Sequence, residues 1–547
     1  MPRSFVAGLL NRLETSQHML DEVLAVEFSK RKEMHGARRH RAKLLAHEVI
    51  RRRATLDQIL KVYSSRPPEN MEHHVRTVLR LALAEWFFVE PIPRRPEEIE
   101  AARARQRERP EEDDDRRRRS SSDDDVERDE RDDDDRPRNR DRDRERERDD
   151  RDRDDRDERR GRGRRRRRRG HHTPEWSDDD PSHQDENMPV ARGPIAAAAV
   201  NLVGTGRPSR GFVNGVLRAV DRETTYDAEG IIAPGEYPRD RMPAGYGGVY
   251  TFRRQLFADP TKKTTQWLAQ FCSFNKWLAE RFVARYGLDE AVAIGEASNG
   301  QPALSARINT RRIQPDELVA QLEAAGIPVT RTGFPEVIRL DKRVPLVGTE
   351  WFENGLLYLQ DFTATRVAHL AGLEPGMRVL DACAAPGGKI THACELLGGK
   401  GTFVACDSSD RRLALLEDNL ERLGHDEVDV LCSDLRTYAA GSPEKFDVIF
   451  VDAPCSNTGV LSRRAEARWR ACDKLQQSLI TLQVELLRAA KSMLTDTGRI
   501  IYSTCTLEPE ENRGVVVQTD LNLVQDWLWL PENGLHDGGY HAVLTAK

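Results

Sequence analysis

The stretch Asp381-Ala382-Cys383-Ala384-Ala385-Pro386-Gly387-Gly388-Lys389 decides the fold of the C-terminal part of this chain. It follows Arg378-Val379-Leu380, which predicts a strand, and it leads into a segment with the pattern of a helix. Small residues let a backbone approach a ligand closely, and a helix N-terminus favours negative charge. The stretch matches neither G-x-G-x-x-G nor G-x-x-x-x-G-K-[ST], so neither a nicotinamide site nor an ATP site is indicated.

Strands and helices alternate on the C-terminal side of this stretch. The run 446–451 is apolar enough to be buried on both faces, as central strands of parallel sheets are. Further strands are expected at 401–406, 428–432 and 499–502, with helices at 411–423 and 475–494. The alternation predicts an α/β domain over residues 346–547 with a doubly wound, Rossmann-like sheet and right-handed crossovers.

Acidic residues follow two successive predicted strands. Asp407 ends the second strand, where an acid characteristically binds ribose hydroxyls. Asp434 follows the third strand, where it can meet the adenine side of a nucleoside. Each acid taken alone could equally be a helix cap. Together with the Gly-rich first loop, they favour a cofactor that contains a nucleoside.

Two cysteines follow the last two predicted strands of the sheet. Cys455 lies in Asp452-Ala453-Pro454-Cys455-Ser456, and Cys505 lies in Ser503-Thr504-Cys505-Thr506. A single free cysteine is usually a core residue, but two at strand ends indicate a catalytic pair. A thiolate that adds to carbon-6 of cytosine activates carbon-5 for attack on a methyl sulfonium. Asp452 could then stabilise the activated ring, and the cation of Lys389 could favour the thiolate.

The N-terminal side predicts other kinds of domain. Residues 263–345 mix predicted helices at 267–286 and 315–325 with strands at 303–308 and 337–340, which indicates a small α+β module. Residues 224–262 are rich in Gly and Pro and predict an interdomain linker. Residues 1–92 show helical periodicity that resumes near 194, so we expect one all-α domain over 1–223 with an insert.

The insert at about 94–187 is a run of alternating Arg and Asp or Glu. It has no apolar periodicity, so it is expected to be disordered. It also accounts for much of the 33% charged content of the chain. The run Arg164–Arg169 could contact RNA phosphates. We favour the alternative that the insert is a tolerated loop expansion, because long loops cost little free energy.

Cysteine spacing and hydropathy limit the remaining possibilities. The chain has 8 cysteines with no C-x-x-C pair, so we expect reduced thiols, a cytoplasmic protein and no metal site. The first 12 residues contain too short an apolar run for a signal peptide, and no run suffices for a membrane span.

The quoted motifs resemble the RsmB/Sun (Fmu) family of 16S rRNA cytosine-C5 methyltransferases. The resemblance rests on Asp381–Lys389, Asp452–Gly459 and Tyr502–Cys505, followed by Glu508-Pro509-Glu510-Glu511-Asn512. Arg307-Ile308-Asn309-Thr310 and Gln360-Asp361 also match family positions. The helical region is similar to the NusB-type RNA-binding domain of bacterial members, on both flanks of the insert.

The resemblance implies roles for particular residues. Cys505 would be the nucleophile, Cys455 would assist release, and Asp452 and Lys389 would complete the catalytic set. S-adenosylmethionine would be held by Cys383, Ala384, Ala385, Pro386, Gly387, Gly388, Lys389, Asp407, Asp434 and Asp452. The implied substrate is a cytosine of 16S rRNA, modified by a monomer before the subunit is fully assembled.

The sequence also departs from the family pattern. Asn457 stands where the family usually has Gly, residues 463–466 lack the usual His-Pro pair, and the segment after Asn512 looks shortened. The motifs do not encode the target, so a transfer-RNA cytosine methyltransferase is the main alternative. A non-catalytic RNA-binding or ribosome assembly factor is a second alternative, and a NusB-like transcription factor with a fused domain is a third.

Overall fold

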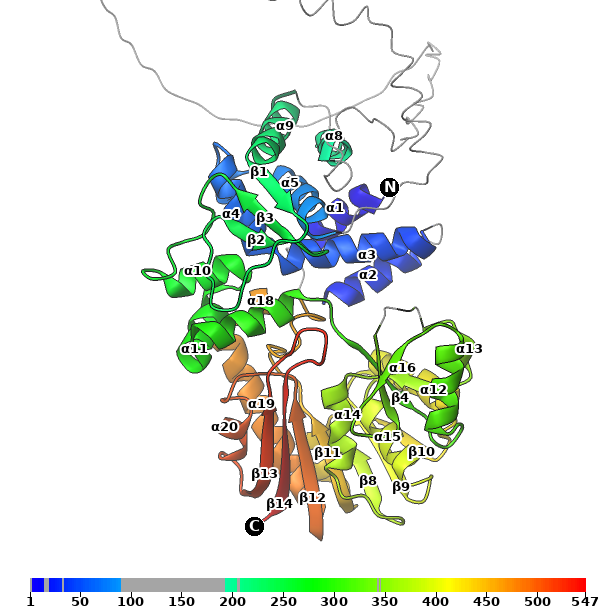
Figure 1. Ribbon diagram of the computed structural model, residues 1–547. Coiled ribbons are helices and arrows are strands. Elements are labelled where there is room, and N and C mark those ends of the chain that lie inside the picture. Colours follow the sequence, from blue (N-terminus) through cyan, green and yellow to red (C-terminus); the bar gives the residue numbers. More distant parts are fainter. Residues whose placement is uncertain are drawn as a thin grey trace, which may run out of the picture. The chain divides into compact units, whose positions relative to one another are not determined.

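The computed structural model describes residues 2–13, 19–31, 34–89, 192–203, 207–341, 344 and 346–547 (Figure 1). The charged insert predicted at about 94–187, including Arg164–Arg169, lies outside the described residues.

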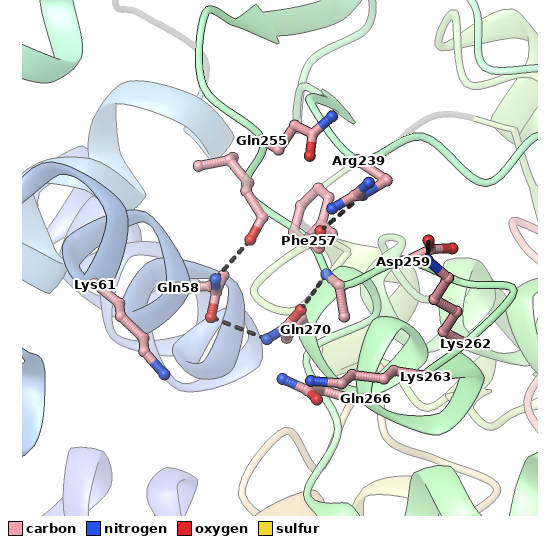
Figure 2. Close-up of a pocket in the computed structure, with 12 residues that line it drawn as sticks. Gln58, Lys61, Arg239, Gln255, Phe257, Asp259, Lys262, Lys263, Gln266 and Gln270 are labelled. Atoms are coloured by element: carbon pink, nitrogen blue, oxygen red, sulfur yellow. Dashed lines mark hydrogen bonds and ion pairs between the residues drawn. The ribbon is translucent and has the colours of Figure 1, made fainter.

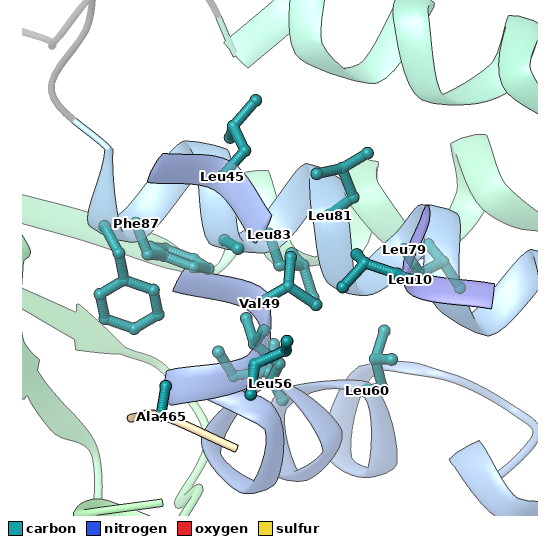
Figure 3. Close-up of a cluster of buried hydrophobic side chains, with 14 of the residues drawn as sticks. Leu10, Leu45, Val49, Leu56, Leu60, Leu79, Leu81, Leu83, Phe87 and Ala465 are labelled. Carbon is teal, nitrogen blue, oxygen red and sulfur yellow. The ribbon is translucent and has the colours of Figure 1, made fainter. Parts of the chain in front are cut away.

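The N-terminal region is helical, as its periodicity predicts. Helix α5 is the centre of the bundle, because 13 of its 16 residues are buried. Helices from both sides of the insert pack against α5. Figure 3 shows leucines of several helices converging with Phe87 and with Ala465, which belongs to the C-terminal part of the chain. The elements are α1 (Pro2–Leu13), α2 (Leu20–Ser29), α3 (Gly36–Arg51), α4 (Arg53–Tyr63), the short 3₁₀ helix η1 (Pro68–Asn70), α5 (His73–Phe88), α8 (Arg192–Leu202) and α9 (Arg207–Arg222).

The segment 224–262 is not the linker that its Gly and Pro content predicted. It forms a small antiparallel sheet in the order β1-β3-β2, from β1 (Thr224–Asp227), β2 (Arg241–Pro243) and β3 (Val249–Phe252). Tyr250 and Phe252 are buried in the helical core, and the Tyr250 ring meets Phe87 edge to face at 4.7 Å. The linker prediction was wrong because the Gly and Pro residues make turns, while the short apolar strand between them is buried.

The next region begins with two helices where one was predicted. The chain forms α10 (Thr264–Phe271) and α11 (Lys276–Asn299), separated at Ser273, whose backbone φ is 60°. A four-stranded antiparallel sheet follows in the order β5-β6-β4-β7. Its elements are β4 (Leu304–Ile308), α12 (Pro315–Ala324), β5 (Val329–Arg331), β6 (Val337–Leu340), α13 (Glu350–Glu353) and β7 (Leu357–Leu359). The module therefore extends past the predicted boundary at residue 345.

The C-terminal region is a seven-stranded sheet in the order β10-β9-β8-β11-β12-β14-β13. The first five strands are parallel, which confirms the predicted α/β fold. Its elements are α14 (Phe362–His369), β8 (Arg378–Asp381), α15 (Gly388–Leu396), β9 (Thr402–Asp407), α16 (Asp410–Leu423), β10 (Val428–Cys432), α17 (Leu435–Gly441), β11 (Phe446–Asp452), α18 (Ala467–Arg470), α19 (Asp473–Ser492), β12 (Leu494–Thr504), α20 (Arg513–Val516), β13 (Leu521–Trp529) and β14 (Gly539–Ala546).

Strand β11 shows why this sheet is stable at its centre. Ile449 and Val451 pack into one hydrophobic cluster, while Val448 and Phe450 pack into the other. Alternate side chains of a strand point to opposite faces, so both faces of β11 are covered. Beyond β12, the antiparallel strands β14 and β13 complete the sheet, so the segment after Asn512 contributes two strands despite its shortened appearance.

Within the described residues, no helix is both long and apolar enough to span a membrane.

Candidate active site

The parallel strands bring several of the predicted site residues to one edge of the sheet. Strands β8, β9 and β11 end at Asp381, Asp407 and Asp452, and Cys505 directly follows β12. These carboxyl ends of neighbouring parallel strands are where doubly wound sheets bind ligands.

The loop between β8 and α15 has a backbone shape that demands glycine. Gly387 has a φ of 105°, and a Cβ at this position would lie 2.5 Å from the Leu416 side chain. Asp407, at the end of the neighbouring strand β9, supports the loop, because its carboxylate accepts a hydrogen bond from the Ala385 amide at 3.2 Å. Asp407 also accepts from the Ser409 amide and pairs with Arg412 at 3.3 Å. Asp407 therefore shapes the loop, and its predicted contact with ribose hydroxyls stays a prediction.

Acidic groups surround the loop. Burial raises the pKa of the Cys383 thiol, and the carboxylates of Asp381, Asp452 and Asp407 raise it further. Burial also raises the pKa of Asp381 to about 7, although the Lys389 cation opposes this shift. An edge with several carboxylates fits a cofactor that carries a sulfonium cation, an ammonium group and ribose hydroxyls.

Lys389 links this loop to the cysteines. Its Nζ lies 2.6 Å from Asp452 Oδ2, and its side chain is 12% exposed. Burial by itself would lower the pKa of Lys389, but the carboxylates of Asp452 and Asp381 and the neighbouring Cys505 sulfur together raise it. Lys389 is therefore a cation at neutral pH, and its charge interacts electrostatically with Cys505.

The two cysteines lie side by side. The Cys455 and Cys505 Sγ atoms are 3.1 Å apart. Cys455 is buried, while Cys505 is partly exposed. The hydrogen bond with Cys505 raises the pKa of Cys455 well above its usual value, and burial adds to the effect. Cys455 is thus a protonated thiol at neutral pH, placed beside a more accessible sulfur.

A buried polar network ties the two cysteine turns together. The Ser456 amide donates to Glu511 Oε2 at 2.9 Å, and the Ser456 hydroxyl lies 2.8 Å from the Thr506 hydroxyl. The Thr458 hydroxyl contacts the same Thr506 oxygen at 2.9 Å. Gln483 donates to the Pro454 carbonyl at 2.8 Å. These bonds explain why Cys455 and Cys505 keep their positions on two different turns.

Asp434 has another set of contacts. Its side chain caps α17 by accepting from the Arg436 amide at 2.8 Å, and it pairs with the Arg436 guanidinium at 2.7 Å. The hydrogen bond from the Arg436 side chain lowers the pKa of Asp434. The structure thus gives Asp434 the role of a helix cap, and its predicted contact with adenine remains a prediction.

Arg307 and Glu511 also belong to the site, but the sequence analysis named them only as members of segments that resemble the family and predicted no contact for either. Arg307 on β4 is fully buried and donates to the carbonyl of Gly388 at 2.6 Å. It also donates to Thr391 Oγ1 at 2.8 Å and to Glu395 at 2.7 and 2.9 Å. The small module thereby fixes the first turns of α15, which carry Lys389.

Residues 463–466, which lack the His-Pro pair usual in the family, are held in place by other contacts. Arg463 pairs with Asp361 at 3.3 Å, binds Asp537 through a second ion pair, and donates to the Ala303 carbonyl at 2.6 Å. The nearby Arg468 is fully buried and donates to the Arg51 carbonyl at 2.8 Å. Ion pairs and backbone contacts therefore hold this segment.

Two clusters among the described residues have the ligand types of a metal site. One contains Glu336, His369 and His392, and the other contains Cys394, His425 and Glu427. In the first, both histidine rings share Glu336 Oε1, at 2.6 and 3.2 Å. In the second, the Arg311 guanidinium lies 2.9 Å from His425 Nδ1. The contacts of the first cluster are thus among its own members, whereas the second is also bound by the cation of Arg311.

A pocket of about 350 Å³ lies between α4 and the segment 239–270 (Figure 2). Lys61 and Lys263 extend toward it from opposite walls in Figure 2, and neither forms an ion pair with a described residue. The other lining residues are Gln58, Arg239, Gln255, Leu256, Phe257, Ala258, Asp259, Lys262, Gln266 and Gln270. With four cations and one carboxylate, the pocket favours an anion.

Comparisons with known proteins agree with this arrangement of domains. The family described as 16S rRNA methyltransferase RsmB/F matches residues 368–535. The ferredoxin-like domain of RsmF/B-like methyltransferases matches residues 274–347, and the NusB family matches residues 1–110.

Curated relatives carry the same description. Ribosomal RNA small subunit methyltransferase B of Enterobacter sp. (strain 638) is 36% identical over 45% of this chain and 58% of the relative. The protein of that name from Pseudomonas syringae pv. tomato is 32% identical over 60% of this chain and 66% of the relative. This chain thus spans 58% to 66% of these relatives' own length.

A solved structure shares the fold. The crystal structure of PH0851 superposes with a TM-score of 0.63 at 18% identity, covering 100% of this chain and 99% of that chain. At this identity the likeness concerns the fold alone.

Proposed function

We propose that this chain methylates carbon-5 of a cytosine in the RNA of the small ribosomal subunit. The proposal starts from its membership of the RsmB/F methyltransferase family. The observation that carries the proposal is the pair of sulfur atoms of Cys455 and Cys505, which lie 3.1 Å apart. Carbon-5 of cytosine is a poor nucleophile, so its methylation requires covalent activation by a group such as a thiolate.

Cys505 is the better nucleophile of the two. It is partly exposed and interacts electrostatically with the Lys389 cation, whereas Cys455 is buried and has a raised pKa. Cys505 loses its proton to water, and its sulfur forms a bond with carbon-6 of the cytosine. The electron pair of the carbon-5–carbon-6 double bond then becomes available at carbon-5. Carbon-5 would form the new bond to the methyl group as the bond between that group and the sulfonium sulfur of the donor breaks, and the electron pair of the broken bond would leave on that sulfur.

The remaining steps restore the ring. The carbon-5 proton leaves to a base, the carbon-6–sulfur bond breaks, and the electron pair from the carbon-5–hydrogen bond re-forms the double bond. Cys505 departs as a thiolate, and the protonated thiol of Cys455 beside it can donate a hydrogen bond to the leaving sulfur. We therefore assign Cys455 to release of the methylated product.

S-adenosylmethionine would supply the methyl group as an electrophilic sulfonium. The loop Cys383–Gly388 and Lys389 would hold it, with Asp407, Asp434 and Asp452 at neighbouring strand ends. The Gly387 backbone and the carboxylates around Cys383 fit this cofactor, because they offer close backbone approach and negative charge. Asp452, paired with Lys389, would also meet the amino edge of the cytosine.

RNA would be bound by surfaces outside the catalytic sheet as well. The NusB family match covers the N-terminal helices α1 to α5, and the pocket lined by Lys61 and Lys263 adds cations between α4 and residues 239–270. Phosphate groups are the part of RNA that such cations bind, without regard to sequence. We infer that the pocket contacts the RNA backbone.

Methyl transfer from tritiated S-adenosylmethionine to unmodified small-subunit rRNA tests the proposal. Wild type should form 5-methylcytosine, and Cys505→Ala should form none. Cys455→Ala should accumulate a covalent protein–RNA adduct, visible on a denaturing gel, because release is impaired. Cys472→Ala is the matched control, since Cys472 is exposed and is not part of the pair, and it should behave as wild type.

The other outcomes separate the alternatives. Methylation of transfer RNA but not of rRNA would keep the mechanism and refute the substrate. Failure of wild type to methylate either RNA and to bind S-adenosylmethionine would refute the enzyme proposal. A non-catalytic RNA-binding factor would then be the leading explanation.

A further inference from the structure

Asn457 has an unusual backbone conformation next to the cysteine pair. Its φ is 61°, in the left-handed region that favours glycine. Asparagine tolerates this region better than most residues when its side chain bonds locally. The Asn457 carboxamide does so, because its Nδ2 donates to the Cys455 carbonyl at 2.7 Å.

This bond determines which way the carboxamide faces. The Cys455 carbonyl can only accept a hydrogen bond, so the Asn457 nitrogen must point toward it. A flipped carboxamide would place two acceptor oxygens against each other. Asn457 Oδ1 therefore faces the Cys505 sulfur, which lies 3.1 Å away.

The orientation of the carboxamide determines which of the two thiols donates a hydrogen bond to the other. Asn457 Oδ1 carries no hydrogen, so Cys505 must be the donor in their contact. A thiol has only one hydrogen, so Cys505 has none left for Cys455. Cys455 must then donate to the Cys505 sulfur across their 3.1 Å contact. The Cys455 thiol therefore donates a hydrogen bond to the Cys505 sulfur, and the Cys505 thiol donates one to Asn457 Oδ1.

We propose that Asn457 is a positioning residue that holds the nucleophile Cys505 in its thiol form until substrate binds. The inference rests on the proposed role of Cys505 as the nucleophile. A hydrogen bond to the neutral form of a group favours that form. A carboxamide cannot take the proton, and its oxygen would repel a thiolate.

Two groups therefore act on the Cys505 sulfur in opposite directions. The positive charge of Lys389 acts on it electrostatically and favours the thiolate, while the Asn457 hydrogen bond favours the thiol. Cys455 donates to the same sulfur, and Asp452 offsets part of the Lys389 charge through their 2.6 Å ion pair. Removal of the Asn457 carboxamide shifts this balance toward the reactive thiolate.

Alkylation by iodoacetamide measures the reactivity of Cys505 independently of methyl transfer. Asn457→Gly removes the carboxamide and suits a φ of 61°. Its Cys505 should react about fivefold faster than in wild type, the factor equivalent to about 1 kcal/mol for one hydrogen bond. Asn457→Asp keeps the shape and places a charged acceptor beside the sulfur, so its Cys505 should react more slowly than in wild type.

Peptide mass spectrometry would follow each cysteine separately. The exposed Cys432 and Cys472 are internal references, and their rates should be the same in all three proteins. Methyl transfer gives a second readout, in which Asn457→Gly should change kcat and leave KM for S-adenosylmethionine within about twofold of wild type.

Equal Cys505 alkylation rates in wild type, Asn457→Gly and Asn457→Asp would overturn the inference. If Asn457→Gly alone fails to fold, the slower reaction expected of the isosteric Asn457→Asp still decides the question. Failure of the proposed function would appear differently, as absent methyl transfer in wild type with the alkylation order unchanged.

Discussion

Replacement of Arg307 by methionine would test how the small module supports the seven-stranded sheet. The Arg307 guanidinium and the Glu395 carboxylate are both buried, with side chains 0% and 2% exposed. Burial would raise the pKa of Glu395, but Arg307 and the neighbouring histidine His425 hold it below its ordinary value. Arg307→Met would leave this carboxylate without its main partner and would free the carbonyl of Gly388.

The size of the effect follows from that burial. Removal of one partner from a buried ion pair costs about 3–5 kcal/mol, because the remaining charge is uncompensated. At about 2–4 °C per kcal/mol, the fall in Tm is on the order of 10 °C. Replacement of both partners, in Arg307→Met with Glu395→Met, should recover most of the stability, because a buried ion pair and an apolar pair of similar size differ little in stability.

Thermal unfolding followed by circular dichroism would measure these variants, and calorimetry would measure S-adenosylmethionine binding. Arg331→Met is the matched control, because its ion pair with Asp316 is 52% and 87% exposed. That change should cost at most about 1 kcal/mol. A destabilisation by Arg307→Met no larger than that by Arg331→Met would refute the reasoning, and so would a double variant as unstable as the single one.

The cationic pocket, Asp381 and Phe252 provide three further tests. Lys61→Gln with Lys263→Gln should lower the slope of log affinity against log salt in filter binding to small-subunit rRNA, by about 0.7 to 0.9 for each phosphate group that is no longer neutralised. Lys400→Gln, on an exposed loop before β9, should leave that slope unchanged. Burial raises the pKa of Asp381 from 3.8 to about 7, so the folded state keeps a proton that the unfolded chain has released, and stability falls as pH rises through this interval. Asp381→Asn removes this pH dependence, so its Tm relative to wild type should increase between about pH 4 and pH 7. Phe252→Ala should destabilise the N-terminal region by about 3–5 kcal/mol in denaturant unfolding, whereas a residue of a true linker would cost little.

The sequence predicts the seven-stranded sheet because the signals for most of its strands are local. Apolar runs, Gly-rich turns and amphipathic helices each occupy a few neighbouring residues, and their alternation implies a parallel sheet. The residues that follow each strand are therefore expected at one edge of the sheet. Asp407, Asp452, Cys455 and Cys505 all follow from this argument.

The same kind of local signal gave a wrong prediction, an interdomain linker, for residues 224–262. Strands β1, β2 and β3 have only 3 or 4 residues each, too few to show a two-residue period. Their Gly and Pro neighbours dominate the composition and predict a linker. What makes them strands is burial of Tyr250 and Phe252 against α5, a contact between segments more than 150 residues apart in the sequence.

Residues that act through another element could not be predicted either. Arg307 belongs to a strand of the small module, yet its partners Gly388 and Glu395 lie on α15, more than 80 residues away. Asn457 stands out in the sequence as a departure from glycine, but sequence alone does not show that its carboxamide faces Cys505. Both roles depend on which atoms the fold brings within hydrogen-bond distance of each other.

The register of two strands explains why the cysteine pair forms at all. Strands β11 and β12 are parallel neighbours, with Asp452 opposite Ser503. The ladder continues for one more bond, from the Ala453 amide to the Ser503 carbonyl. Counted from this pair, Cys505 lies two residues further along the chain and Cys455 lies three, and their sulfur atoms are 3.1 Å apart. A shift of one residue in this register would move each side chain to the opposite face and separate the sulfur atoms. The geometry of the cysteine pair is therefore set by backbone pairing in the sheet, and the polar network around Ser456 and Thr506 preserves it beyond the strand ends.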